Sequence, residues 1–379
     1  MDKVKVKRFF IFLLSLGVLF FQSCENKKYR NSALEDVSIV IDVDSTKIEP
    51  LKLNHILYVP LETSSECLIG HTSKVLIRDN RIYVADFDQA KALFVFDLSG
   101  KFIFKISKTG NGPNEYISFY DFDIQTNGDI YIHDNYGKKI LVFNSVGEYL
   151  QTIRVNYFFS SFCLAKNKMY WSKLMENGKM IANPAVFDID NQKTEFLFTS
   201  KSILSEFSVN FNAYSFYYSP GITYYAPKFS EIIYSINNEG VFPAIRIKNL
   251  HLPPQKVLEE WIKEENPQKL MKSIMESPYF IENVLIYETD DYISIGMTKG
   301  ALINNLLYKK HSKSAVLISD YFEIIGSNRI MGSIGKEFFS VVDFNPENEY
   351  HKAILKSKKD LASWKNEDNP VIVFFSLNM

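Results

Sequence analysis

The 379-residue sequence predicts an all-β fold built from repeated short sheets. One strand pattern occurs twice in nearly the same wording, over residues 81–106 and again over residues 129–153. Equivalent residues of the two copies, such as Gly100 and Gly147, lie 47 or 48 positions apart. Phe, Tyr and Trp make up 15% of the chain, which favours stacked sheets over a helical bundle. A repeat of this length made of short strands is typical of the blades of a β-propeller.

Four more divergent copies follow the first two, which makes six blades in all. The third copy is drawn through residues 168–198, the fourth through 221–247, the fifth through 292–308 and the sixth through 329–342. In the first three copies we take residues 81–86, 129–134 and 168–171 as the inner strands. A ring of repeats keeps so long a chain in one domain, because each blade is buried only against its neighbours. We therefore predict one six-bladed β-propeller over residues 37–379.

The two ends of this domain are expected to close the ring. Residues 37–43 form a first strand, residues 56–61 a second short one, and residues 371–375 lie in a terminal strand. A propeller is sealed when strands from the two chain ends share one blade, which leaves no long exposed sheet edge. We predict that residues 37–43 and 371–375 lie together in the closing region.

A small helical insertion is predicted at about residues 254–277, between the fourth and fifth copies. Leu258, Trp261 and Ile262 fall at the spacing of one helix face, and residues 270–275 resume such a stripe after a proline. An apolar stripe of this kind must pack on the ring. The sequence leaves open whether the insertion covers the central channel or packs on the flank.

Residues 1–23 have the pattern of a lipoprotein signal peptide. Basic residues precede a 13-residue apolar run, which is shorter than the roughly 20 residues that span a bilayer as a helix. Ser23 and Cys24 follow, and we expect Cys24 to be the lipidated N-terminus. Residues 24–36 are polar and are expected to form a flexible tether. The alternative is an ordinary signal peptide followed by an incidental cysteine.

Several motifs distributed over nearly the whole mature chain carry a family resemblance. They are residues 60–63 and 67–70, the strand and turn at 95–103, the glycine-rich joint at 110–116, and residues 369–371. With these motifs the chain resembles the six-bladed β-propeller lipoproteins of Gram-negative bacteria, relatives of NHL-repeat and TolB-like propellers. The resemblance implies a propeller fold, a membrane anchor at Cys24 and a place in the cell envelope, and it implies no established reaction. Glu25 followed by Lys27 is a poor acidic run, which favours a periplasm-facing outer-membrane position over the cell surface.

The most specific of these motifs is the joint between the first two repeats, residues 108–116. A glycine-rich bend there is expected to present Glu115 and Lys108 at the mouth of the ring. Four joint residues are candidate ligand-binding residues: Lys108, Asn111, Glu115 and Tyr116. The alternative is a structural loop, in which the glycines take special backbone angles and Glu115 bonds loop amides.

Asp86 and Asp134 are two further ligand-binding candidates, because they recur at the same repeat position after a strand taken as inner. Their alternative role is a hydrogen bond that stabilises each blade. The aromatic run at residues 214–218, with Tyr224 and Tyr225 nearby, offers stacking faces for a sugar. Buried packing between blades is the alternative for these rings.

No metal, cofactor or catalytic residue is predicted. The six histidines are far apart, and no His-x-x-x-His or Cys-x-x-Cys pair occurs. Asp-x-Asp pairs at 86/88, 121/123 and 188/190 suit either Ca²⁺ or backbone amides in turns. Neither a nucleophile elbow nor a phosphate-binding loop is present. A net charge of −1 without a basic stripe argues against a nucleic-acid partner.

These patterns favour a non-enzymatic binding or scaffold module, tethered through Cys24, that holds a glycan, a peptide or an envelope protein. The alternative is a metal-dependent hydrolase or lyase of the NHL-like or lactonase propeller type. We also predict that Cys67 and Cys163 are buried free thiols, since they lie about two repeats apart and a disulfide needs Cα atoms within about 7 Å.

Overall fold

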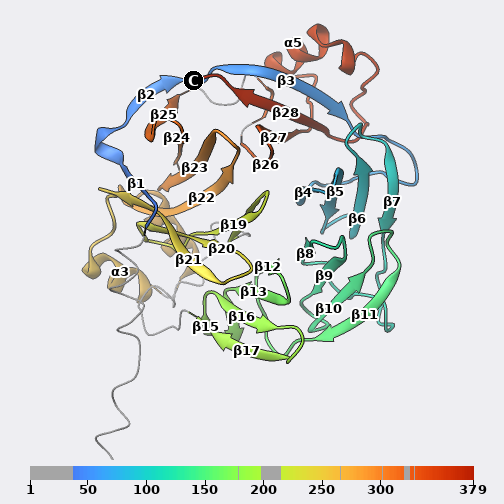
Figure 1. The fold of residues 1–379 in the computed structure, drawn as a ribbon, viewed down its shortest axis with the longest axis horizontal. Helices are drawn as coiled ribbons and strands as arrows, with labels where there is room; N and C mark the ends of the chain where they lie inside the picture. The colour runs from blue at the N-terminus through green and yellow to red at the C-terminus, as the bar shows by residue number, and fades with distance from the viewer. Residues whose placement is uncertain are drawn as a thin grey trace, which may run out of the picture.

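The computed structural model describes residues 37–177, 179–197, 215–264, 266–300, 302–319, 325–327 and 329–379. Within these residues, six sheets of four or five strands are arranged around one central axis (Figure 1). The predicted six-bladed β-propeller is therefore confirmed. The signal peptide expected at residues 1–23, Cys24 and the tether at 24–36 lie outside the described residues.

The blades are numbered along the chain, and their strands are given from the innermost outward. Blade 1 contains β4 (Lys74–Arg78), β5 (Arg81–Asp86), β6 (Ala92–Asp97) and β7 (Phe102–Ile106). Blade 2 contains β8 (Asp121–Ile124), β9 (Ile130–Asp134), β10 (Lys139–Phe143) and β11 (Tyr149–Arg154). Blade 3 contains β12 (Ser161–Ala165), β13 (Lys168–Ser172), β16 (Ala185–Asp188) and β17 (Lys193–Phe196), with a hairpin of β14 (Leu174–Glu176) and β15 (Lys179–Ala182) inserted after β13.

The second half of the ring follows the same order. Blade 4 contains β18 (Phe216–Ser219), β19 (Ile222–Tyr225), β20 (Ile232–Ile236) and β21 (Val241–Lys248). Blade 5 contains β22 (Phe280–Glu288), β23 (Tyr292–Lys299), β24 (Leu302–Lys309) and β25 (Ser314–Ser319). Blade 6 contains β26 (Gly332–Ile334), β27 (Glu337–Val342), β28 (Val371–Leu377) and, as its outermost strand, β3 (Leu53–Pro60).

The ring is closed by β3 rather than by the first strand of the domain. β3 pairs antiparallel with β28, with Tyr58 opposite Val373. β1 (Ile39–Asp42) instead pairs parallel with β21 of blade 4, and β2 (Lys47–Pro50) pairs parallel with β25 of blade 5. The predicted closure by residues 37–43 is therefore wrong. The N-terminal segment, bent at η1 (Val43–Ser45), first covers the outer edges of two blades and only then reaches blade 6 (Figure 1).

The inner strands of the first three blades were also wrongly predicted from the sequence. The strands taken as inner, such as β5 and β9, are second in their sheets, and β4 and β8 lie inside them. Except for β22, the inner strands have only three to five residues, and they mix polar with apolar residues because they meet both the axis and the neighbouring blades. β8 reads Asp-Phe-Asp-Ile, and its two buried carboxylates hide the apolar pattern of a buried strand.

The hydrophobic core lies between the faces of neighbouring blades. Between blades 2 and 3, Trp171 is fully buried and stacks between Phe159 and Phe187, with ring centroids 4.8 Å apart in each pair. Burying a large apolar side chain contributes about 1.5–3 kcal/mol, so such layers stabilise every blade against the next. Cys67 and Cys163 are buried free thiols, as predicted.

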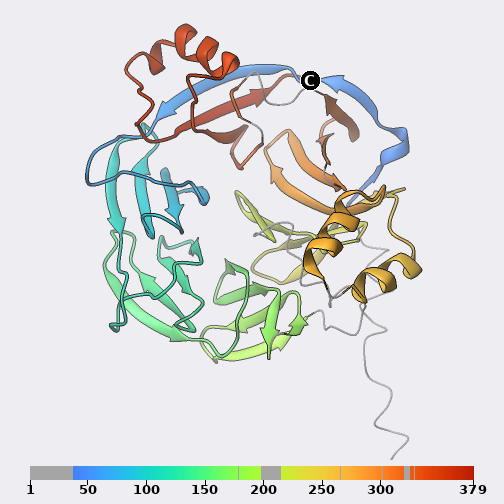
Figure 2. The same ribbon diagram turned by 180° about the vertical axis from the view of Figure 1, so that it is seen from behind.

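The predicted helical insertion is confirmed as α3 (Gln255–Ile262) and α4 (Pro267–Met275). Trp261 and Ile274 pack against Phe229 of blade 4 and Ile281 of blade 5. Figure 2 shows both helices over the periphery of the ring, so the insertion does not cover its centre.

Two short helices of blade 6 were not predicted. α5 (Glu349–Ser357) and η3 (Lys359–Leu361) lie between β27 and β28, and they pack through Ile354 and Leu361. Among the described helices, none combines the length and the apolar character needed to cross a membrane.

Candidate functional site

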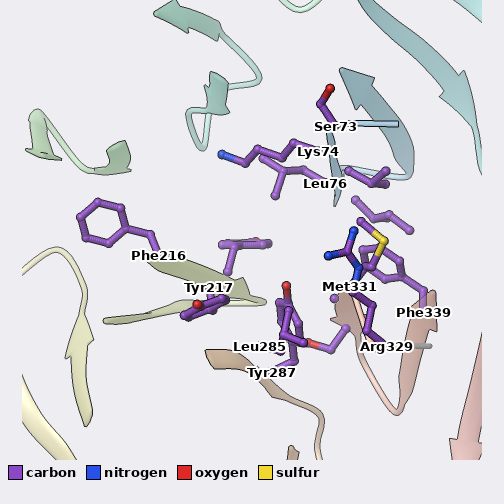
Figure 3. A pocket seen from close by; sticks show the side chains of 15 residues that line it. Ser73, Lys74, Leu76, Phe216, Tyr217, Leu285, Tyr287, Arg329, Met331 and Phe339 are labelled. Atoms are coloured by element: carbon purple, nitrogen blue, oxygen red, sulfur yellow. The ribbon is translucent and has the colours of Figure 1, made fainter. Parts of the chain in front are cut away.

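A cavity of about 70 Å³ lies at the centre of the ring, between the inner strands of blades 1, 4, 5 and 6 (Figure 3). We call it the central cavity. Blade 1 contributes Lys74 and Leu76 from β4, and blade 4 contributes Phe216 and Tyr217 from β18. Tyr287 comes from β22 of blade 5. Blade 6 contributes Met331, just before β26, and Arg329 two residues earlier.

The inner strands also meet across the axis beside this cavity. The guanidinium of Arg78, at the end of β4, lies 3.7 Å from the ring centroid of Tyr218 on β18. The Ser333 hydroxyl of β26 donates a hydrogen bond to the Ser219 hydroxyl of β18 at 3.2 Å. These contacts bridge the centre of the ring at the ends of β4 and β18. The central cavity lies toward the other end of these strands, where Lys74 and Phe216 are found.

Lys74 and Arg329 are the two cations that line the central cavity, and their surroundings differ. The Lys74 ammonium lies 2.7 Å from the Asp121 carboxylate and also donates to the Phe122 carbonyl at 2.7 Å. Arg329 is exposed, and its guanidinium forms no ion pair or hydrogen bond with any residue that the structure describes. The positive charge of Lys74 is therefore balanced by Asp121, whereas that of Arg329 has no counter-charge among the described residues.

Tyr287 brings a second hydrogen-bonding group to the central cavity. Its side chain is 9% exposed, and its hydroxyl has no hydrogen-bond partner among the described residues. Burial raises the pKa of Tyr287, and the nearby charge of Arg329 opposes this only in part. The hydroxyl therefore stays protonated at neutral pH and is able to donate. Figure 3 shows Tyr287 and Arg329 directed toward the same space.

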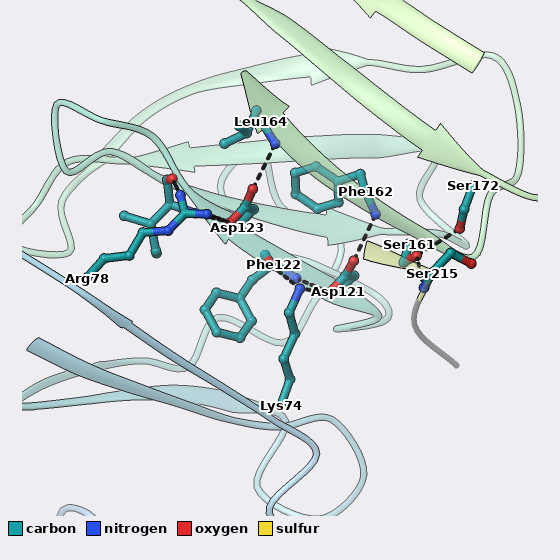
Figure 4. A network of polar contacts seen from close by, with 11 residues as sticks. Lys74, Arg78, Asp121, Phe122, Asp123, Ser161, Phe162, Leu164, Ser172 and Ser215 are labelled. Atoms are coloured by element: carbon teal, nitrogen blue, oxygen red, sulfur yellow. Dashed lines mark hydrogen bonds and ion pairs between the residues drawn. The ribbon is translucent and has the colours of Figure 1, made fainter. Parts of the chain in front are cut away.

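Asp121 and Asp123 of β8 tie three inner strands together beside the central cavity (Figure 4). Asp121 accepts from Lys74 at 2.7 Å, and Asp123 pairs with Arg78 at 3.0 Å, so both carboxylates reach β4. Their second oxygens accept backbone N–H groups of β12 at 2.9 and 2.7 Å. Burial raises the pKa of Asp121, and the Lys74 ammonium works against this rise.

Asp121 and Asp123 thus accept backbone amides, as one of the two alternatives expected, but they do so from strand β8 to strand β12 and not in a turn. Each carboxylate also has a cation as a partner. Asp188 likewise accepts the N–H of Asn191 at 2.9 Å. Across the described residues, no group of three or more His, Cys, Asp and Glu side chains is arranged to hold a metal ion.

The joint between blades 1 and 2 lies beside the outer strand of blade 2, and not at the mouth of the ring. Thr152 of β11 donates to the Pro113 carbonyl at 3.1 Å. Lys108 and Asn111 are exposed, and Asn111 borders an open hollow of about 450 Å³ against β11. The central cavity has no lining residue from the joint. The expected presentation of Glu115 and Lys108 at the mouth is therefore wrong.

Inside the joint, Glu115 and Tyr116 have mainly intraloop partners. The Glu115 carboxylate accepts the Gly112 N–H at 2.8 Å, and a Cβ on Gly110 would collide with it. Tyr116 is fully buried, donates to the Lys91 carbonyl at 2.5 Å and has its pKa raised to about 12 by burial. Ligand binding by these residues stays a prediction, and the contacts are those of the structural alternative.

Asp86 and Asp134 occupy equivalent positions at the ends of β5 and β9. Both are fully buried, and each accepts several backbone N–H groups at 2.8 to 3.1 Å. Burial alone raises the pKa of Asp86, but the backbone donors outweigh it, and the pKa lies below its ordinary value. Neither carboxylate reaches solvent, so these contacts hold the blades. A ligand-binding role for the two residues stays a prediction.

The sequence indicated the residues on one side of the central cavity but not those on the other sides. Phe216 and Tyr217 belong to the aromatic run noted as a stacking surface, whose first residue lies outside the described residues. Lys74, Tyr287 and Arg329 were not singled out, because they come from three blades far apart in sequence. All three residues lie on or just before the innermost strand of a blade, and the sequence pattern did not identify that strand.

Comparisons with known proteins place this propeller among similar folds. It is similar to the crystal structure of an exported protein from Bacteroides fragilis, with a TM-score of 0.72, 17% identity, and coverage of 90% of this chain and 100% of that one. It is also similar to a DUF4221 family member from Bacteroides vulgatus, with a TM-score of 0.53, 11% identity, and coverage of 86% and 97%. Virginiamycin B lyase from Staphylococcus aureus gives a TM-score of 0.37 at 11% identity, with coverage of 75% and 80%. At these identities the likeness to the two Bacteroides structures shows the fold alone.

No functionally curated protein matches the sequence significantly. One family of domains does match, over residues 38–376, which is nearly the whole of the described propeller. The chain therefore belongs to the DUF4934 family, whose description is a domain of unknown function.

Proposed function

We propose that this protein is an exported binding module of the bacterial envelope that holds its ligand in the central cavity. The observation that carries the proposal is the pair Tyr287 and Arg329. Both groups point into a cavity at the ring's axis, and neither has a hydrogen-bond partner among the described residues. The Tyr287 hydroxyl belongs to a buried side chain, and buried polar groups normally have such partners. Arg329 is exposed beside it, so both groups are available to a ligand.

The size of the central cavity limits what enters it. A volume of about 70 Å³ holds a few water molecules or one small chemical group. The ligand is thus a glycan, a peptide or an envelope protein that inserts one end group, while its remainder lies outside against the surrounding loops. A metal-dependent hydrolase or lyase, the alternative from the sequence, has no supporting metal-ligand cluster among the described residues, and we do not propose it.

The envelope position and the lipid anchor are also part of the proposal. They are supported by the short apolar run before Cys24, and the similar Bacteroides fragilis protein is described as exported. We propose that the anchored protein faces the periplasm from the outer membrane. Incorporation of a labelled fatty acid into the wild type and its absence from Cys24→Ser test the anchor. Degradation by protease added to intact cells would instead indicate the cell surface.

A blocked cavity tests the binding site itself. A glycan array, a peptide library and a pull-down from the envelope fraction identify ligands of the purified protein. Met331→Trp fills the central cavity, whereas Leu302→Trp places the same ring at a position that is 69% exposed. We expect Met331→Trp to abolish binding and Leu302→Trp to retain it. A ligand that binds both variants equally well would place its site elsewhere.

A further inference from the structure

We infer that the central cavity recognises a carboxylate group on its ligand. This inference rests on the proposed function, since it names the chemistry of the group that enters the cavity. It is carried by a surplus positive charge, by the shape of the donor groups and by the apolar remainder of the lining.

The charge surplus follows from the ion pairs around the cavity. Among the described residues, the lining contains two cations and no acidic side chain. Three carboxylates on the nearby inner strands already have cationic partners: Asp121 with Lys74, Asp123 with Arg78, and Glu288 with Lys310. A fourth, Glu282 of β22, favours the charged forms of Lys173 and Lys228. Within the described part of the chain, Arg329 is thus the cation of the lining that has no acidic partner. A concave site with one sign of charge favours a ligand of the other sign.

The donor geometry favours a carboxylate. A guanidinium is a planar fork whose paired N–H groups match the two oxygens of a carboxylate. The Tyr287 hydroxyl adds a third donor close to Arg329, and it stays protonated because burial raises its pKa. A phosphate has more oxygen atoms and more charge to satisfy. Within the described lining, these two side chains are the donors without a protein partner, so the planar anion is the better match.

The rest of the lining suits the carbon body that carries such a group. Leu76, Leu285 and Met331 contribute apolar atoms to this lining, and the Phe216 ring lies on the side away from Arg329 (Figure 3). Two sources offer a carboxylate on a compact body, namely an acidic sugar and the C-terminus of a peptide. The recognised chemistry is the same for both, and matched probes separate them.

The test is a set of matched ligands titrated into the purified full-length protein, with the melting temperature and the dissociation constant as readouts. Glucuronate, glucose and glucose 6-phosphate share one sugar ring. N-acetylglycylglycine and its C-terminal amide share one peptide body. We expect the acid of one or both pairs to bind, and its neutral partner to bind at least ten-fold more weakly.

Single-residue variants test whether Arg329 and Tyr287 cause the preference for the acid. Arg329→Gln is expected to weaken binding of the acid by about ten-fold or more, because a charge-assisted hydrogen bond is lost. Arg329→Lys keeps the charge but not the fork and should recover only part of the affinity, and Tyr287→Phe should lose less than Arg329→Gln. Lys336→Gln removes the same charge from an exposed turn of the same blade and should bind like the wild type.

The outcomes separate this inference from the proposed function. Stronger binding of glucose 6-phosphate than of either acid overturns the inference, as does the absence of any response to both acids. A neutral ligand that binds wild type and Arg329→Gln equally, but not Met331→Trp, overturns the carboxylate and supports the cavity as the binding site. An acid that binds Met331→Trp as well as the wild type overturns both.

Discussion

Replacing Asp121 by Asn tests whether buried ion pairs hold the inner strands together. Asp121 is fully buried, and the side chain of its partner Lys74 is only 14% exposed, so neither charge has much access to water. The Asn side chain retains one acceptor for the 2.9 Å bond from the Phe162 N–H. It has no charge to offset the ammonium, and its NH₂ group faces a donor.

The expected loss of stability follows from that uncompensated charge. Removing one partner of a buried ion pair typically costs about 3–5 kcal/mol, against a total domain stability of about 5–15 kcal/mol. Asp121→Asn should therefore lower the urea midpoint strongly, as measured by circular dichroism. The combined variant with Lys74→Met should recover part of the loss, because it removes the unpaired charge.

An exposed pair on α4 provides the control. Lys272 and Glu276 lie 3.9 Å apart with both side chains largely exposed, and Glu276→Gln should change the urea midpoint little. If Asp121→Asn unfolds at the same urea concentration as the wild type, the pair does not hold the ring. If the double variant is no better than the single one, the loss has another origin than an unpaired ammonium.

Three further predictions concern acid stability, ring closure and metals. Asp86 has a pKa below its ordinary value of 3.8, so it stabilises the fold above that pH, and the contribution is lost as the pH falls through the lower folded pKa. Asp86→Asn should therefore be less stable than the wild type at neutral pH, and the difference in unfolding free energy should shrink in acid. A difference that stays constant with pH would contradict this. Val373→Pro removes a backbone N–H from β28, which lies between β27 and β3. It should lower the melting temperature far more than Ser38→Pro, which lies just before β1. Equal effects of the two variants would refute closure of the ring by β3. Added Ca²⁺, Zn²⁺ or EDTA should leave the melting temperature unchanged, whereas a rise with either ion would favour the metal-dependent alternative.

The number of blades and the helical insertion could be predicted from the sequence, because both are encoded locally. Each blade repeats a strand and turn pattern within about 50 residues, as Gly100 and Gly147 show, and α3 and α4 have their own helical period. The inner strands could not be assigned in this way. Except for β22 they are short, and a strand such as β8 buries carboxylates whose partners come from another blade.

What the sequence by itself determined is therefore the repeating unit, since a strand, a turn or a helix stripe depends on residues close together in the chain. Only the tertiary structure decided which N-terminal strand closes the ring, because β1, β2 and β3 each have a sheet edge to join and the choice depends on where blades 4, 5 and 6 lie. The central cavity was decided in the same way. Phe216, Tyr287 and Arg329 belong to three blades, and they become neighbours only when the closed ring brings its inner strands to one axis.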